Sequence, residues 1–276
     1  MYKTLLVPVD GRPRSTRSLE LAGRIASQWE AHVVGLYVGY TPYVPSAARA
    51  GLGSELLAEY QGKLRDEQTA AARARFDAGV KAAGIANAEW RTEVGDLALT
   101  VALHARYADL VVVNQTDPAE DSPANFADEV VLALGRPLLI VPYVGAINSF
   151  AQDILVCWNA RREAARAVTD ALPLLQRAKR VIVLSVDGNA SPGGHGESPG
   201  SDIALYLARH GVRAEAARTG SGGLDIGSVI LSRAFDYSAD LIVMGAYGHS
   251  RVREIVLGGA TRSVLKSMTV PVLMSH

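Results

Sequence analysis

Cysteine is almost absent from this sequence: Cys157 is the only one in 276 residues. A single cysteine cannot form an internal disulfide, which excludes the disulfide-stabilised frameworks of small secreted domains. No apolar run approaches the roughly 20 residues that a membrane-spanning helix needs. The first residues, MYKTLLVPVDG, lack the apolar core of a secretion signal. We therefore expect a cytoplasmic protein without a membrane partner.

An excess of charge is also lacking, because Lys and Arg total 28 and Asp and Glu total 28. Nucleic-acid-binding domains usually carry a basic excess, so we expect no nucleic-acid partner. The chain has no Gly-x4-Gly-Lys-Ser/Thr loop and no Gly-x-Ser-x-Gly turn, which argues against P-loop NTPases and α/β-hydrolases. His195 and Glu197 have no second ligand pair at suitable spacing, so no metal site is expected.

Short apolar runs alternate with segments of helical periodicity along the whole chain. In the first half, strands are predicted at 4–10, 32–38, 89–93, 108–113 and 136–142, and helices at 15–29, 55–83, 96–106 and 124–134. The first helix has apolar residues at three-to-four spacing (Leu19, Ala22, Ala26 and Trp29). The long helix has an apolar stripe through Leu57, Leu64 and Ala71.

After a linker at 143–151 the same order of elements begins again. Ile154 to Asn159 matches Leu5 to Asp10, and Ala239-Asp240-Leu241 matches Ala108-Asp109-Leu110. The chain is thus predicted to be a tandem duplication with domains at 1–143 and 152–276. Alternating strands and helices predict a doubly wound α/β fold, with a five-stranded parallel sheet and helices on both faces in each domain. A Gly/Ser/Pro-rich loop is expected at 187–201.

Glycines punctuate the fourth strand and the following loop of the second half. The apolar run 241–244 ends at Gly245, Gly248 follows, and the pair Gly258-Gly259 precedes a helical pattern from Ala260. Glycine allows close approach of a phosphate to the backbone, and a helix N-terminus attracts anions. The stretch therefore predicts an anion site for a nucleotide polyphosphate. The corresponding stretch of the first half, 114–122, contains acids and no glycine.

These features together resemble the universal stress protein family, over essentially the whole chain. The family pattern Gly-x2-Gly-x9-Gly-Ser/Thr is matched here as Gly245-x2-Gly248-x9-Gly258-Gly259. The resemblance implies two Rossmann-like, adenine-nucleotide-hydrolase-like domains and a regulatory role in the stress response. It also implies ATP, ADP or AMP as ligand, with Mg²⁺ as an accompanying ion, and assembly as a homodimer. The nucleotide-binding residues predicted from the resemblance and the strand ends are Cys157, Trp158, Asn159, Val186, Met244, Gly245, Tyr247, Gly248, His249, Gly258, Gly259, Ala260 and Thr261.

The sequence departs from the family pattern at two positions. Asn159 replaces an acid after the first strand, and Gly259 replaces a hydroxyl residue after the third glycine. At Gly259 a neutral hydrogen bond is lost, which costs about 0.5–1.5 kcal/mol and predicts weaker binding. At Asn159 the acceptor is no longer ionised, and since a bond to an ionised acceptor is roughly twice as strong, this change predicts weaker binding or an altered base preference. The first half keeps Asp10 but lacks the glycine loop, and it is expected to be a degenerate partner.

Three functions follow as hypotheses: an ATP-binding regulatory protein, a slow ATPase or autophosphorylating enzyme at the same site, and a scaffold without nucleotide. No catalytic residue is assigned, because His249 is the only candidate base near the phosphates and any hydrolysis should be slow. Simpler roles remain open for individual residues. The glycines could serve ordinary turns, Asn159 could cap a turn, Val186 could be core, and Cys157 is expected to be an inert thiol.

Overall fold

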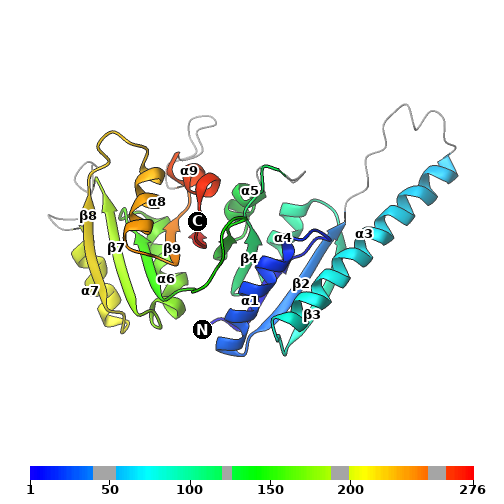
Figure 1. Ribbon diagram of the computed structural model, residues 1–276, viewed down its shortest axis with the longest axis horizontal. Coiled ribbons are helices and arrows are strands. Elements are labelled where there is room, and N and C mark those ends of the chain that lie inside the picture. Colours follow the sequence, from blue (N-terminus) through cyan, green and yellow to red (C-terminus); the bar gives the residue numbers. More distant parts are fainter. Residues whose placement is uncertain (40–53, 120–125, 188–198, 248–258) are drawn as a thin grey trace. The chain divides into compact units, whose positions relative to one another are not determined.

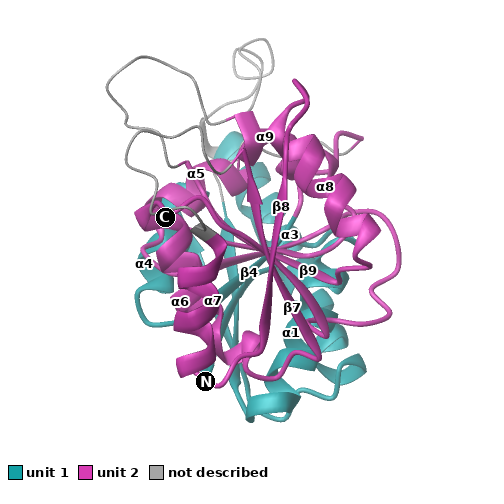
Figure 2. Cartoon of the chain, turned by 90° about the vertical axis from the view of Figure 1, so that its left-hand side faces the viewer, with its two compact units in different colours: residues 1–114 teal, residues 115–276 magenta. Residues whose placement is uncertain are grey.

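The computed structural model describes residues 1–39, 54–119, 126–187, 199–247 and 259–276 (Figure 1). The chain divides into two compact units, Met1–Asn114 and Gln115–His276, and each is described by itself (Figure 2). The first unit contains β1 (Thr4–Pro8), α1 (Ser15–Trp29), β2 (His32–Gly39), α3 (Ser54–Ala82), β3 (Ala88–Val94), α4 (Leu97–Ala105) and β4 (Leu110–Asn114). The second contains α5 (Phe126–Ala133), β5 (Leu138–Val141), β6 (Asp153–Cys157), α6 (Arg162–Leu175), β7 (Arg180–Val186), α7 (Pro199–Arg209), β8 (Ala214–Thr219), α8 (Ile226–Asp236), β9 (Leu241–Gly245), α9 (Gly259–Ser267) and β10 (Val272–Ser275).

The first unit is built on a parallel sheet in the order β3-β2-β1-β4. The central strands are continuous apolar runs because both of their faces are covered. Helix α1 buries Leu19, Ala22, Ala26 and Trp29, which confirms the predicted apolar face.

The predicted apolar stripe of α3 is wrong. Ala72 and Phe76 are the buried apolar residues of this helix, whereas Ala71 is exposed and Leu57 and Leu64 are partly exposed. The reason is that only the C-terminal half of α3 packs against α1 and β2, as Figure 1 shows. Which residues of α3 are buried is therefore decided by its contacts with α1 and β2.

The second unit has the strand order β8-β7-β6-β9-β10, with these five strands parallel, and β5 pairs antiparallel with β10. Figure 2 shows α6 and α7 on one face of this sheet and α8 on the other. Because β5 lies beside β10, the compact unit begins at Gln115 rather than after the linker at 143–151. The domain limits 1–143 and 152–276 describe the repeat and stay a prediction.

Two boundaries in the second repeat differ from the sequence expectation. The predicted loop at 187–201 does not extend to residue 201, since Pro199 begins α7, where proline loses no helical hydrogen bond. Residues 188–198 lie outside the described residues. The β-branched residues Thr269 and Val270 predict strand character from residue 269, but the last strand begins at Val272. Pro271 has no amide hydrogen to donate to a ladder.

The repeated Ala-Asp-Leu sequence has the same structural role in both units. Asp109 accepts hydrogen bonds from the backbone N–H groups of Lys3 and Thr4, at 2.6 and 3.0 Å. Asp240 likewise accepts from Gln152 and Asp153, at 2.9 and 3.0 Å. Each aspartate thus satisfies backbone donors where the neighbouring strand begins.

Candidate functional site

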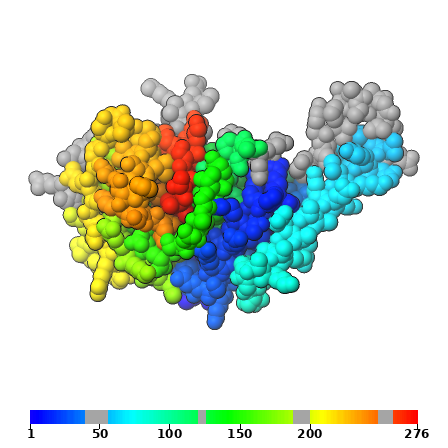
Figure 3. All heavy atoms as spheres, in the orientation of Figure 1, coloured from blue at the N-terminus to red at the C-terminus, as the bar shows by residue number. Residues whose placement is uncertain are grey.

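A cavity of about 310 Å³ lies at the carboxyl ends of β6, β7 and β9. The N-terminal ends of α8 and α9 also line it, and Figure 3 shows α9 in red beside α8 in orange. The cavity lies where the strand order reverses between β6 and β9, the usual ligand position in open α/β sheets. Its lining residues are Cys157, Trp158, Asn159, Arg161, Leu184, Val186, Asp225, Ile226, Ile230, Met244, Gly245, Tyr247, Gly259, Ala260 and Thr261.

The structure brings ten of the residues predicted from the sequence to this cavity. They are Cys157, Trp158, Asn159, Val186, Met244, Gly245, Tyr247, Gly259, Ala260 and Thr261. The other three, Gly248, His249 and Gly258, lie outside the described residues. Five lining residues were not predicted: Arg161, Leu184, Asp225, Ile226 and Ile230. The repeat offers a signal for Asp225, because the helix that follows β3 has its N-cap at Asp96.

Only a glycine fits at position 245, because α6 packs against the backbone there. A Cβ at this position would lie 2.5 Å from the backbone N of Ala164 and 2.6 Å from the carbonyl carbon of Glu163, both in α6. Real Cβ atoms do not approach other atoms so closely. The absence of a side chain therefore lets β9 and α6 pack together, whatever binds in the cavity.

The first turn of α9 supplies hydrogen-bond donors to the cavity wall. Gly259, Ala260 and Thr261 lie in that turn, whose N–H groups have no partner four residues earlier in the helix. Together with the helix dipole, such donors favour an anion. Thr261 is buried, and its hydroxyl accepts a hydrogen bond from the N–H of Tyr247 at 3.4 Å.

The end of β6 forms another part of the wall. Asn159 caps a turn, because its Oδ1 accepts from the N–H of Arg161 at 3.1 Å, and it also lines the cavity. Trp158 also lines the cavity. Burial raises the pKa of Cys157 to about 12, so its thiol is protonated and weakly reactive at neutral pH.

Asp225 gives the cavity a negative charge close to Gly259. It caps α8 by accepting from the N–H of Ser228 at 3.0 Å. That bond and those from the Ser263 and Ser228 hydroxyls lower the pKa of Asp225, despite partial desolvation, so it is ionised at neutral pH. A Cβ on Gly259 would lie 3.6 Å from Asp225 Oδ1, which is an ordinary contact.

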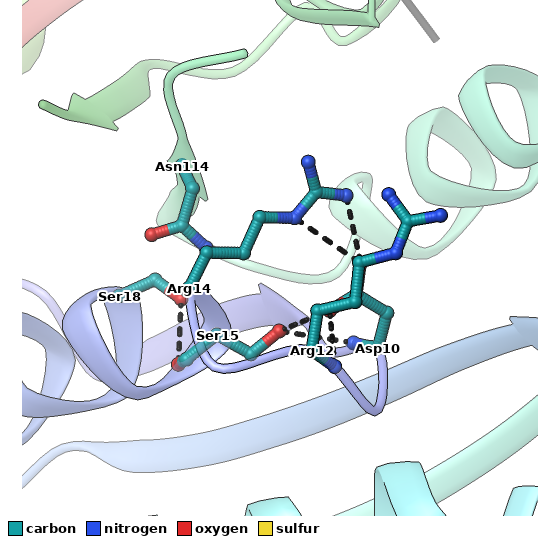
Figure 4. Close-up of polar contacts among 6 residues, drawn as sticks. All are labelled: Asp10, Arg12, Arg14, Ser15, Ser18 and Asn114. Carbon is teal, nitrogen blue, oxygen red and sulfur yellow. Dashed lines mark hydrogen bonds and ion pairs between the residues drawn. The ribbon is translucent and has the colours of Figure 1, made fainter. Parts of the chain in front are cut away.

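In the first repeat, the strand ends that correspond to the cavity are hydrogen-bonded to side chains of the same repeat (Figure 4). Asp10 accepts from the Arg12 N–H at 3.1 Å, from the Ser15 hydroxyl at 2.7 Å, and from Nη2 of Arg14 at 2.7 Å. Asn114 replaces the glycine at the end of the fourth strand, and its Nδ2 donates to the Ser18 hydroxyl at 3.1 Å. The Asp10 carboxylate is therefore already engaged in internal hydrogen bonds.

The cavity of the second repeat combines two kinds of surface. Apolar side chains from the strand ends and α8 form one part (Trp158, Leu184, Val186, Ile230 and Met244), and the first turn of α9 forms the other. Such a site suits a ligand with a flat apolar ring and an anionic group. Within the described ranges, no three His, Cys, Asp or Glu residues are placed to hold a metal ion. No described helix is long and apolar enough to cross a membrane.

Comparison with known proteins gives the same family over both halves. The model of the universal stress protein family matches residues 1–141 and 151–276. A universal stress protein of Archaeoglobus fulgidus has a similar structure, with a TM-score of 0.74 at 17% identity, over 99% of this chain and 97% of that one. The structure of PA1789 from Pseudomonas aeruginosa, a protein of unknown function, has a TM-score of 0.61 at 15% identity. That match covers 99% of this chain and 92% of PA1789.

Sequence similarity to a curated relative is local. Universal stress protein Slr1230 of Synechocystis is 50% identical over 38 residues, which are 14% of this chain and 13% of the relative. The matches to the family model cover nearly the whole chain, in tandem and in the order that the internal repeat requires. The chain belongs to the universal stress protein family.

Proposed function

We propose that the chain is an adenine-nucleotide-binding regulatory protein of the stress response, with ATP bound in the cavity of the second repeat. The observation that carries this proposal is the cavity itself, which joins apolar strand ends to the first turn of α9. The base would lie against Trp158, Val186 and Met244, and the phosphates would lie at the N–H groups of 259–261. We expect the protein to act in the cytoplasm.

The cavity supports binding better than hydrolysis. Among its described lining residues Asp225 is the single carboxylate, and it is engaged by Ser228 at the start of α8. A general base needs to reach the attacking water, and an occupied capping carboxylate is poorly suited to that task. Bound nucleotide would therefore act by stabilising one conformation or assembly. The expected homodimer can be measured by sedimentation velocity with and without ATP.

Nucleotide binding can be tested on the purified full-length chain. Any co-purifying nucleotide is released by denaturation and identified, and thermal shifts are then measured with ATP, ADP, AMP, cAMP and GTP, each with and without Mg²⁺. A ligand present at 100 times its Kd stabilises the folded state by about 2.7 kcal/mol, which gives a measurable shift. We expect a shift with adenine nucleotides that exceeds the shift with GTP.

A cavity-filling variant locates the site. Val186→Trp places a large ring in the cavity and should abolish the shift. Val94→Trp is the matched control, because Val94 ends β3 and is 61% exposed, so the same bulk extends into solvent there. If no adenine nucleotide stabilises or co-purifies with the wild type, the proposed function is wrong. If Val186→Trp keeps the full shift, the assigned site is wrong.

A further inference from the structure

Tyr247 lies in the wall of the cavity with an unusual backbone conformation. Its φ is +55°, in the left-handed region that bulky side chains rarely adopt. Its N–H donates to Thr261, in the first turn of α9. A residue keeps such a conformation only when surrounding contacts hold it there. Residues held in this way are often found at ligand sites.

The second contact that fixes Tyr247 comes from the first repeat. The Tyr247 hydroxyl donates a hydrogen bond to the Asp128 carboxylate, in α5. Burial, this hydrogen bond and the charge of Asp128 raise the pKa of Tyr247, so the phenol remains protonated and can donate. A hydrogen bond to an ionised acceptor is stronger and more directional than a neutral one.

The segment that leads to α5 makes a second, independent contact with α9. Gln115 is buried, and its Nε2 donates to the carbonyl oxygen of Leu265 in α9 at 2.8 Å. Its Oε1 accepts from the N–H of Tyr143 at 3.1 Å, which fixes the orientation of the amide. Figure 3 shows α9, in red, with green residues on the side opposite to α8. The helix that lines the cavity at its N-terminus is thus held near its C-terminus.

We propose that Asp128 is a positioning residue of the nucleotide cavity: it holds the Tyr247 ring against the ligand, so that a helix of the first repeat completes the site of the second. This proposal rests on the proposed function. It gives the degenerate first repeat a role, since α5 orders the wall that a nucleotide contacts. The ligand does not touch Asp128, which acts through Tyr247.

The proposal is tested by a double-mutant cycle in the full chain, with ATP affinity measured by calorimetry. Tyr247→Phe removes the donor and Asp128→Ala removes the acceptor. Each should weaken ATP binding about five- to tenfold, because only part of the lost hydrogen bond is felt by a ligand that the ring contacts, and the double variant should lose no more than either alone. Asp128→Asn keeps an acceptor oxygen and should give an intermediate loss. Glu129→Gln is the matched control, because Glu129 is the exposed neighbour on α5, and its affinity should equal that of the wild type.

Unfolding midpoints of the nucleotide-free variants separate positioning from stability. If Asp128→Ala lowers the midpoint but leaves the ATP Kd within twofold of the wild type, Asp128 is only structural and the proposal is wrong. Additive losses in the double variant would also refute it. If the wild type itself binds no adenine nucleotide, the proposed function fails first, and this proposal fails with it.

Discussion

Replacing Gly245 by alanine should destabilise the protein even when no ligand is bound. The added Cβ would lie 2.5 Å from the backbone N of Ala164, whereas ordinary contacts begin at 3.4 Å, so α6 would have to move by about 0.9 Å (3.4 − 2.5). The obstacle is helix backbone, which cannot rotate away as a flexible side chain can. Helix α6 also buries residues such as Ala167, Val168 and Leu174 against the sheet, and those contacts would loosen.

The expected cost is at the upper end of the range for overpacked cores, about 3 kcal/mol. For a chain of this size that corresponds to a decrease of roughly 6–10 °C in the unfolding midpoint. The assay is thermal unfolding of nucleotide-free protein, followed by circular dichroism and repeated in urea. Removal of nucleotide matters, because loss of a bound ligand would also lower the midpoint.

Two glycines provide matched controls for the same substitution. No atom lies within 4 Å of a Cβ at Gly62, in the middle of α3, so Gly62→Ala should stabilise by about 0.5–1 kcal/mol. Gly259→Ala meets only an ordinary contact at 3.6 Å and should change stability by less than about 0.5 kcal/mol. If Gly245→Ala behaves like Gly259→Ala, packing against α6 is not the reason for the glycine.

Further expectations concern the cavity and the strand ends. Gly259→Ser restores the hydroxyl of the family pattern and should tighten ATP binding about three- to tenfold by calorimetry; an unchanged Kd would show that the hydroxyl does not reach the phosphates. Asp225→Asn keeps a capping side chain but removes a negative charge beside Gly259. ATP should therefore bind about fivefold tighter at low salt, whereas the affinity for adenosine should not change. Equal effects on both ligands would contradict electrostatic repulsion between Asp225 and the phosphates. Asp240→Ala leaves two backbone donors unsatisfied and should cost about 2–3 kcal/mol in urea unfolding, against less than about 0.5 kcal/mol for the exposed Asp236→Ala. The Cys157 thiol should react with iodoacetamide at pH 7.5 at least about tenfold more slowly than a free thiol, because burial raises its pKa to about 12 and lowers its thiolate fraction. A rate near that of the free thiol would contradict the raised pKa.

Much of the candidate site could be predicted because it lies at repeated strand ends. The carboxyl ends of neighbouring parallel strands must meet at one edge of a sheet, so Asn159 and Gly245 could be placed together from the order of elements. Val186 was predicted from the family resemblance, and it lines the same cavity. Asp225 caps α8 and Ile226 begins it, after the edge strand β8. They were missed because the N-cap at Asp96 was not carried over to the second repeat. The contact of Asp128 with Tyr247 could not be predicted, since 119 residues separate them.

The sequence by itself determined the tandem α/β plan, because strand and helix periodicities are local and the second half repeats the first. It also showed which half keeps the glycines and which keeps the acid at Asp10. Only the tertiary structure decided what each of these does: Gly245 makes room for α6, and Asp10 is occupied by Arg14 and Ser15. Both roles depend on distances between separate elements, and those are set by packing, which no single segment of sequence contains.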